Sequence, residues 1–243
     1  MTVTVDGTVI TNRVIPAGLV IAANDVTVQG NIIEGPTALS FDQAALRVEG
    51  ERVKILDNLI RGTSASDWTQ DPINGVKLVG ASVQFARNDV NHIAGDGISL
   101  YGEGATVIGN WVHDFVVRDG GAHYDGLHYP TPGNDQAMAA LIQDNTIELW
   151  VLGSVDSGMT AALGLPDLSP GIVVDHNLIA GGNYALMGGG PGTTITRNLF
   201  WTKFSDEVGF YGPAAYVGES GDVVWTDNAY TDDGSSEGAP LGP

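Results

Sequence analysis

Apolar and polar residues alternate in short runs along most of the chain, and each run ends in an asparagine followed by further apolar residues. Two clear examples are VTVQGNII (26–33) and IVVDHNLI (172–179). Alternation with a period of two is typical of a β-strand, and the polar residues around the asparagine predict a turn. The asparagines of this repeat are Asn31, Asn58, Asn88, Asn110, Asn145, Asn177, Asn198 and Asn228.

The spacing of these asparagines varies from 21 to 35 residues, whereas the form of the repeat is constant. One such unit cannot bury its own apolar face, but parallel units stacked about 4.8 Å apart bury a continuous core. The asparagine side chains then form a ladder that bonds backbone groups of their own and neighbouring coils. We therefore predict an all-β parallel β-helix of roughly eight to nine coils. An antiparallel sandwich or propeller is disfavoured, because Asn74-Gly75 is the only Asn-Gly hairpin pair.

The two ends of the chain break the repeat. Residues 1–25 are apolar but contain no asparagine of the repeat, so they predict an N-terminal capping coil within a β-helix domain that spans 1–230. Residues 231–243 (TDDGSSEGAPLGP) are acidic and rich in Gly, Ser and Pro. That composition is typical of a flexible tail or linker.

Composition narrows the function classes. The formal net charge of −19 gives a surface that repels nucleic acid and anionic membranes, and also polyanionic polysaccharide unless calcium or a basic patch intervenes. No apolar run is long enough to predict insertion into a membrane. The absence of cysteine excludes disulfides and thiolate metal sites. The first residues lack the features of a signal peptide, so we expect either a trimmed chain or an extracellular or virion protein that leaves its cell by another route.

The densest group of chemically active side chains lies in the stretch GGAHYDGLHYPTP (120–132). Its candidates are His123, Tyr124, Asp125, His128 and Tyr129. A histidine beside an aspartate can act as a general base, and a tyrosine can act as an acid or stack on a sugar ring. A zinc site is not predicted, because strict strand alternation splits the HxDxxH residues between two faces.

A second pattern, a polar residue followed by glycine and a short strand, predicts which side chains stack. One outward column holds Asn74, Asp96 and Asp125, a second holds Lys77, Ser99 and His128, and a third, which follows the second, is expected to hold Tyr101 and Tyr129. Parallel stacking puts the carboxylates of Asp96 and Asp125 about one strand spacing apart. Three interpretations stay open: an acid/base pair of a glycosidase, a Ca²⁺ site, or aspartates that only begin tight turns.

Basic residues are scarce, so their positions are informative. Lys77 and Arg118 belong to coils around the candidate site, where a lyase acting on uronic acids needs cations, although surface solvation explains them equally well. The predicted catalytic residues are Asp125, His123, Asp96, His128 and Tyr129. The predicted substrate-binding residues are Tyr101, Tyr124, Lys77 and Arg118. No residue is assigned as a metal ligand, and Ca²⁺ is the one cofactor considered.

The repeat resembles that of the right-handed, single-stranded parallel β-helices of the pectate-lyase-like superfamily. More narrowly, GAHYDGLHY, GGNYALMGGG and FYGPAAY resemble motifs of β-helix proteins from actinobacteria and their phages, which read H-x-D-G-I-Q, G-G-N-Y-T-L and Y-G-P. His123, Asp125 and Gly126 match the first motif, whereas Leu127 and His128 stand where Ile-Gln is usual. The resemblance covers about Val26 to Tyr230. The calcium and arginine constellation of pectate lyases is not recognisable.

The superfamily includes polysaccharide lyases, hydrolases, epimerases, phage tailspike depolymerases and members that only bind, so fold alone does not select an activity. Our first hypothesis is a β-helix that binds and cleaves an extracellular or cell-envelope polysaccharide as a lyase or hydrolase. The second is a non-catalytic phage minor-tail or adhesion module that recognises a host surface glycan, as a homotrimer or attached to other tail proteins. A structural spacer, the third, predicts no groove at the candidate face.

Overall fold

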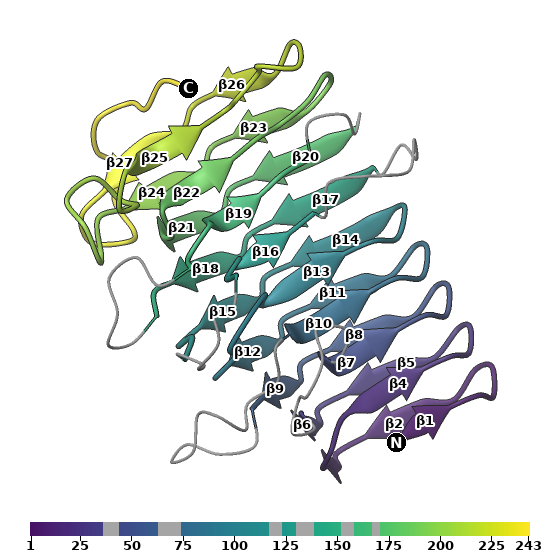
Figure 1. The fold of residues 1–243 in the computed structure, drawn as a ribbon. Helices are drawn as coiled ribbons and strands as arrows, with labels where there is room; N and C mark the ends of the chain where they lie inside the picture. Colours follow the sequence, from purple (N-terminus) through teal and green to yellow (C-terminus); the bar gives the residue numbers. More distant parts are fainter. Residues whose placement is uncertain (36–43, 63–73, 117–122, 130–138, 152–157, 167–170) are drawn as a thin grey trace.

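The chain forms a three-sided stack of strands. The computed structural model describes residues 1–35, 44–62, 74–116, 123–129, 139–151, 158–166 and 171–243. These residues form three parallel sheets of nine strands each and contain no α-helix. Each turn of the chain contributes one strand to each sheet, so nine coils follow one another from the N-terminal to the C-terminal end (Figure 1). The predicted fold class is confirmed.

The strands of the three sheets have the following bounds. Sheet A contains β1 (Thr2–Val3), β4 (Leu19–Ile21), β7 (Ala44–Val48), β10 (Asn74–Leu78), β13 (Ile98–Leu100), β16 (Leu127–His128), β19 (Ala161–Gly164), β22 (Tyr184–Met187) and β25 (Gly212–Ala215). Sheet B contains β2 (Val9–Thr11), β5 (Thr27–Gln29), β8 (Lys54–Leu56), β11 (Gln84–Ala86), β14 (Ala105–Ile108), β17 (Ala140–Gln143), β20 (Ile172–Asp175), β23 (Thr194–Thr196) and β26 (Val224–Thr226). Sheet C contains β3 (Val14–Ile15), β6 (Ile32–Glu34), β9 (Leu59–Arg61), β12 (Asp89–Asn91), β15 (Trp111–His113), β18 (Thr146–Leu149), β21 (Leu178–Gly181), β24 (Leu199–Trp201) and β27 (Ala229–Thr231).

The core consists of columns of apolar side chains that stack from coil to coil. The apolar residue at the inward position of each sheet B strand pairs with its counterpart on the next strand, and its flanking residues point outward. This column, fully buried, contains Val28, Ile55, Phe85, Val107, Ile142, Val174 and Ile195. Burial of one such side chain stabilises the fold by about 1.5–3 kcal/mol, so the columns supply the main driving force for stacking.

The asparagine ladder runs along the corner between sheets B and C. Its eight side chains are at most 2% exposed. Asn58 shows the bonding: its Nδ2 donates to Val28 O at 3.1 Å and to Asn88 Oδ1 at 2.9 Å. The backbone N–H of Asn58 also donates to Asn88 Oδ1, at 3.0 Å. The same bonds recur in every coil up to Asn198, which confirms the predicted ladder.

Each ladder asparagine follows a residue whose backbone is left-handed, for example Asp57 (φ 56°) and Arg87 (φ 55°). A non-glycine residue in this conformation costs roughly 1–2 kcal/mol. The hydrogen bonds that the next asparagine makes offset this cost. The side chains of the left-handed residues point outward, where Arg87 Nε lies 2.6 Å from Asp57 Oδ1.

The first coil is complete, although it lacks the ladder asparagine. Its three strands are β1, β2 and β3, and Arg13 stands at the ladder position. The backbone N–H of Arg13 donates to Asn31 Oδ1 at 3.0 Å, so the ladder reaches the first coil through the backbone alone. The atypical capping coil expected for residues 1–25 therefore has the regular three-sided geometry.

The C-terminal segment 231–243, for which composition suggests a flexible tail or linker, folds back on the last coil. Trp225 Nε1 donates to Leu241 O at 2.6 Å, and the backbone N–H of Tyr230 donates to Ala239 O at 2.9 Å. Leu241 is 9% exposed and joins the core. One apolar residue and a few hydrogen bonds therefore connect this otherwise polar segment to the last coil.

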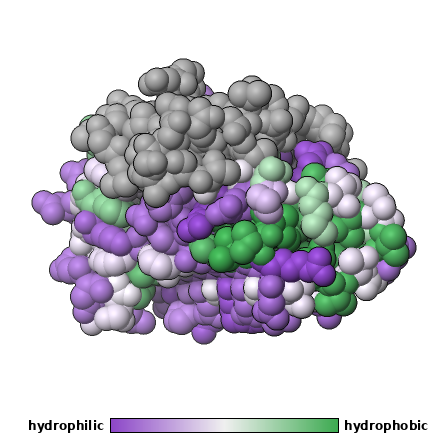
Figure 2. Space-filling view, turned by 90° about the horizontal axis from the view of Figure 1, so that it is seen from below, coloured by the Kyte–Doolittle hydropathy of each residue, from purple (hydrophilic) through white to green (hydrophobic). Residues whose placement is uncertain are grey.

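The surface agrees with the strongly acidic composition. Seen from one side, it is mainly hydrophilic with a smaller apolar area (Figure 2). Within the described ranges, no helix is long and apolar enough to cross a membrane.

Candidate functional site

The outer face of sheet A carries the predicted polar columns. Lys77 pairs with Ser99, and Ser99 pairs with His128, so the second column is confirmed. The backbone N–H of Gly97 donates to Asp125 O at 2.8 Å, which places Asp96 level with Asp125. The register predicted for the two aspartates is therefore also confirmed.

Glycine at the corner before each strand explains why these aspartates point outward. A Cβ on Gly97 would lie 2.5 Å from Gly126 O and 2.6 Å from Val112 Cγ1, so this position faces inward and has no room for a side chain. The next residue, Ile98, is also fully buried. Two inward positions in succession break the strand alternation, and Asp96 emerges on the same face as Ser99.

The three side chains Asp96, Asp125 and His128 form one cluster. His128 Nδ1 lies 3.3 Å from Asp96 Oδ2 and 3.7 Å from Asp125 Oδ2. The hydroxyl of Ser99 donates to Asp96 Oδ2 at 3.3 Å, and the backbone N–H of Ala161 donates to Asp125 Oδ1 at 2.9 Å. Both aspartates are buried, with 5% and 6% exposed. The aspartates thus bond neighbouring coils and His128, which is more than the tight-turn interpretation predicts.

The surroundings of the cluster raise the pKa values of both Asp125 and His128. Burial raises the pKa of Asp125 to about 6; the charge of His128 opposes this shift, and the negative charge of Asp96 adds to it. Burial alone would lower the pKa of His128, but its hydrogen bond to Asp96 and the charges of both aspartates outweigh burial and raise it. Asp125 is therefore a carboxyl group that keeps its proton to near-neutral pH beside a histidine that favours the charged form.

A cavity of about 280 Å³ opens beside the cluster. Asp125, His128 and Tyr129 form one wall, and Ala161 and Gly164 lie between this wall and the far side. The remaining lining residues are Thr160, Leu165, Pro166, Met187, Gly188, Tyr216, Glu219 and Ser220. The cavity therefore holds a second carboxylate, that of Glu219, which comes from the loop after β25.

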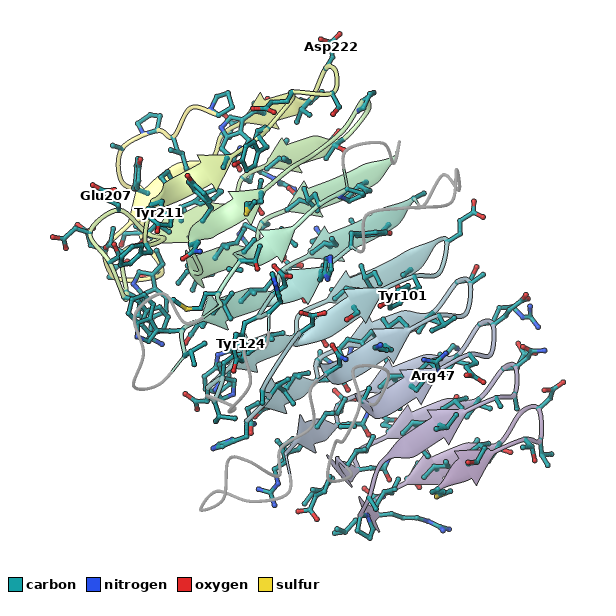
Figure 3. The ribbon with its side chains drawn as sticks, viewed as in Figure 1. Arg47, Tyr101, Tyr124, Glu207, Tyr211 and Asp222 are labelled. Carbon is teal, nitrogen blue, oxygen red and sulfur yellow. The ribbon has the colours of Figure 1, made fainter. Side chains whose placement is uncertain are left out.

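The predicted tyrosines are placed differently from one another. Tyr129 follows His128 by one residue, so it is not in the outward column with Tyr101 but faces inward, and it is 2% exposed. Burial raises its pKa, which makes the phenol a poor proton donor. Tyr124 is 1% exposed and belongs to the core, so its ring offers no face to a sugar. Tyr101 follows β13 and Tyr124 precedes β16, so the two lie toward opposite ends of the sheet A strands (Figure 3).

The other predicted residues that the structure describes do not line the cavity. His123 is exposed, and its charge acts to lower the pKa of nearby Asp125. Lys77 is buried, with its Nζ 5.8 Å from the centre of the Tyr101 ring, and neither residue lines the cavity. Tyr101 lines a separate hollow of about 470 Å³ with three glutamates, Glu49, Glu51 and Glu103. Arg118 lies outside the described residues.

Sequence reasoning missed the far wall of the cavity. Tyr216 and Glu219 belong to a loop three coils after the strand of His128, and the asparagine repeat gives no sign that the two approach. The motif FYGPAAY (210–216) pointed to this segment, but only as part of a resemblance.

The cluster also offers metal-ligand atoms. One donor atom from each of Asp96, Asp125 and His128 lies within 4.8 Å of the other two. Ca²⁺ takes six to eight oxygen ligands, whereas this set supplies two carboxylates and an imidazole nitrogen. Among the described residues, the donor set therefore falls short of a Ca²⁺ site.

Comparisons with known proteins place the fold but not the activity. No protein-family model matches the sequence, and no curated protein matches it. A mutant tailspike protein of E. coli bacteriophage HK620 is similar in structure, with a TM-score of 0.60 and 12% identity over 93% of this chain and 42% of its own. A second mutant of that tailspike, in complex with a pentasaccharide, has a TM-score of 0.58 and 10% identity over the same shares.

Pectate lyase Pel9A is also similar, with a TM-score of 0.51 and 12% identity over 89% of this chain and 66% of its own. The chain thus spans about two fifths of the tailspike chains and about two thirds of the lyase. At these identities the likeness establishes one property: this chain has the parallel β-helix fold that phage tailspikes and a pectate lyase also have.

Proposed function

We propose that this protein binds a polysaccharide on the outer face of sheet A and hydrolyses one of its glycosidic bonds in the cavity beside Asp125. The observation that carries the proposal is the placement of Asp125. It is a buried carboxyl group at the wall of a cavity, beside a histidine that also contacts a second aspartate, with a pKa of about 6. Glycosidases use such a carboxyl group as the general acid.

In the proposed reaction the proton of Asp125 passes to the glycosidic oxygen as the bond from that oxygen to the anomeric carbon breaks. Water attacks the anomeric carbon, and its proton passes to Glu219, the second carboxylate of the cavity. Burial is the main cause that raises the pKa of Asp125, and like-charge repulsion from Asp96 adds to it. His128 holds the two aspartates together through contacts of 3.3 and 3.7 Å.

One feature of the cavity favours hydrolysis over elimination. A lyase needs a cation beside the uronic carboxylate, and no lysine or arginine is among the described residues that line the cavity. A second feature concerns which carboxylate assists Asp125. Asp96 and Asp125 cannot flank a sugar as the two carboxylates of a retaining pair, because both approach one nitrogen of His128. Glu219, on the far wall, suits the second role better.

The test is cleavage of a panel of neutral and acidic polysaccharides by the wild-type chain and by Asp125→Asn. We expect new reducing ends without the ultraviolet absorbance of unsaturated uronic ends. Asp125→Asn should reduce the rate by about 10²–10⁴ while binding is retained. Because the acid must carry its proton, activity should fall as the pH rises through about 6. Unsaturated products would instead indicate a lyase.

A second candidate is a glycan-recognition module without turnover. The support for it is the likeness to tailspike chains, several of which are mutants in complex with a pentasaccharide. In that role the protein would lie on a virion or outside the cell, as a homotrimer or attached to other tail proteins. The narrower resemblance to actinobacterial and actinophage proteins with an H-x-D-G motif fits both candidates. Binding of a glycan with no cleavage of any polymer would favour this candidate.

A further inference from the structure

The outer face of sheet A continues past the cavity toward the last coils. His128 pairs with Gly164, and Asp125 lies level with Ala161, which pairs with Tyr184 on the following strand. Tyr184 therefore lies two strands from Asp125, about 10 Å along the stack. Between them Gly164 and Ala161 carry no more than a methyl group, so this part of the face stays open toward β22.

An aromatic cluster occupies the face at this end. The ring of Tyr184 lies 5.9 Å from that of Tyr211 and 6.5 Å from that of Tyr216, measured between centres. Phe210 packs edge-on against Tyr211 at 4.8 Å. Phe210, Tyr211 and Tyr216 are nevertheless 38%, 53% and 54% exposed. Large apolar rings that gather at the surface mark a binding site, because exposure has a cost that packing inside the protein would avoid.

The cluster is held in place before any ligand arrives. The backbone N–H of Phe210 donates to Gly182 O at 2.8 Å, and that of Tyr211 donates to Asn183 O at 2.8 Å. These bonds fix the segment against the start of β22. A fixed aromatic surface binds with a smaller loss of conformational freedom than a mobile one.

The cluster and the cavity form one surface, because Tyr216 belongs to both. Aromatic faces bind the C–H faces of pyranose rings and place the hydroxyl groups at the edge. Glu219 lies in the cavity, and Glu207 lies on the same side of the last coils as Tyr211 (Figure 3). With a net charge of −19, this surface repels a polyanion.

We propose that Tyr184, Phe210, Tyr211 and Tyr216 form a sugar-stacking platform, and that the polymer running from it along the stack into the Asp125 cavity is an uncharged polysaccharide. The inference rests on the proposed function, since it assumes that this cavity receives the sugar chain. It adds the direction of the polymer, across the strands from β22 toward β16, and it excludes uronic-acid polymers as ligands.

The test is affinity gel electrophoresis with the full chain in its Asp125→Asn form, so that binding is measured without cleavage. The probes are dextran, galactomannan and mannan as uncharged polymers, and polygalacturonate and alginate as polyanions. We expect retardation by at least one uncharged polymer and by neither polyanion. Tyr211→Ala and Tyr216→Ala should each weaken retention about tenfold or more.

Trp111→Ala is the matched control, because Trp111 is an exposed aromatic residue (44%) on sheet C, away from this face. It should leave retention unchanged. Three results would overturn the proposal. They are retention by a polyanion, retention of the Tyr211 and Tyr216 variants equal to that of the parent Asp125→Asn chain, and no retention by any polymer. Cleavage is measured separately with Asp125 intact. If the polymer is retained through Tyr211 and Tyr216 but is not cleaved, only the proposed hydrolase activity is rejected. If the polymer is cleaved and its retention does not depend on Tyr211 and Tyr216, only the platform is rejected.

Discussion

Two columns of polar side chains run along this molecule, and they are bonded in opposite ways. In the ladder between sheets B and C each amide donates to one asparagine and accepts from another, as Asn110 does with Asn145 and Asn88. On sheet A the stacked side chains of Asp96 and Asp125 do not bond each other, and His128 lies beside both.

The difference follows from hydrogen-bonding capacity. An amide carries both a donor and an acceptor, so identical amides satisfy one another at strand spacing, and the arrangement can repeat through the whole stack. An ionised carboxylate only accepts, so two stacked carboxylates need a proton or a cation between them. The ladder therefore stabilises the fold, whereas the carboxylate pair destabilises it and supplies a group that holds a proton for chemistry.

The largest effect is expected from a break in the ladder. Asn110→Ala removes two donated bonds, to Phe85 O and Asn145 Oδ1, and two accepted bonds, both from Asn88. The groups left without partners are buried, so the free energy of unfolding should fall by about 4 kcal/mol in urea denaturation.

Arg52→Ala is the control for this variant. It removes an exposed ion pair with Asp25 at 2.8 Å, also between coils, and should cost less than about 1 kcal/mol. Similar losses for Arg52→Ala and Asn110→Ala would show that the amide ladder contributes no special stability.

The second effect has the opposite sign. The pKa of Asp125 in the folded chain, about 6, lies above its ordinary value of 3.8. The folded state therefore holds this proton more tightly than the unfolded state. The stability that this proton contributes is fully present below about pH 4 and is lost as the pH rises through about 6. The change amounts to roughly 2–3 kcal/mol.

Asp125→Asn, which cannot ionise, should therefore gain stability over the wild type as the pH rises from about 4 to 8. Urea denaturation at several pH values measures the difference between the two chains. The raised pKa of His128 adds a further loss at higher pH, and this loss is smaller in Asp125→Asn because the charge of Asp125 is one of the causes that raise the pKa of His128. Both contributions therefore favour Asp125→Asn over the wild type as the pH rises. A constant difference across this range would contradict a raised pKa at Asp125.

A smaller effect is expected at the glycine corners that turn the aspartates outward. In Gly126→Ala the new Cβ would lie 2.4 Å from Ala162 O and 2.5 Å from Ile147 Cγ2, so the variant should lose about 2 kcal/mol. Gly164→Ala is matched: its nearest contact would be Asp125 Oδ1 at 3.6 Å, an ordinary distance, and thermal unfolding should show little change. Equal melting temperatures for the two variants would show that the corner has room to adapt.

Much of the fold could be predicted because its signals are local and repeated. The alternation of apolar residues and the asparagine repeat specify strand, corner and stacking partner at once. The register of Asp96 and Asp125 could be predicted for the same reason, since each aspartate precedes a glycine and a short strand.

The rest of the site depends on contacts that no repeat encodes. Tyr129 was predicted to lie level with Tyr101, but it follows His128 by one residue whereas Tyr101 follows Ser99 by two, so Tyr129 is level with Leu100 and faces the core. Tyr216 and Glu219 reach the cavity through an irregular loop, whose path depends on packing rather than on alternation. Composition likewise does not show that Leu241 of the C-terminal segment packs on the last coil.

Because of the direction of its hydrogen bonds, the molecule should resist force differently along the stack and across it. The bonds between neighbouring coils, in the three sheets and in the ladder, run along the axis of the stack, whose opposite ends hold the two termini (Figure 1). Tension applied through the termini therefore loads the coils in series, so the hydrogen bonds between neighbouring coils break one coil at a time. A load applied across the axis is shared by all nine coils in parallel. The solenoid is consequently weak when pulled lengthwise and stiff when sheared from the side.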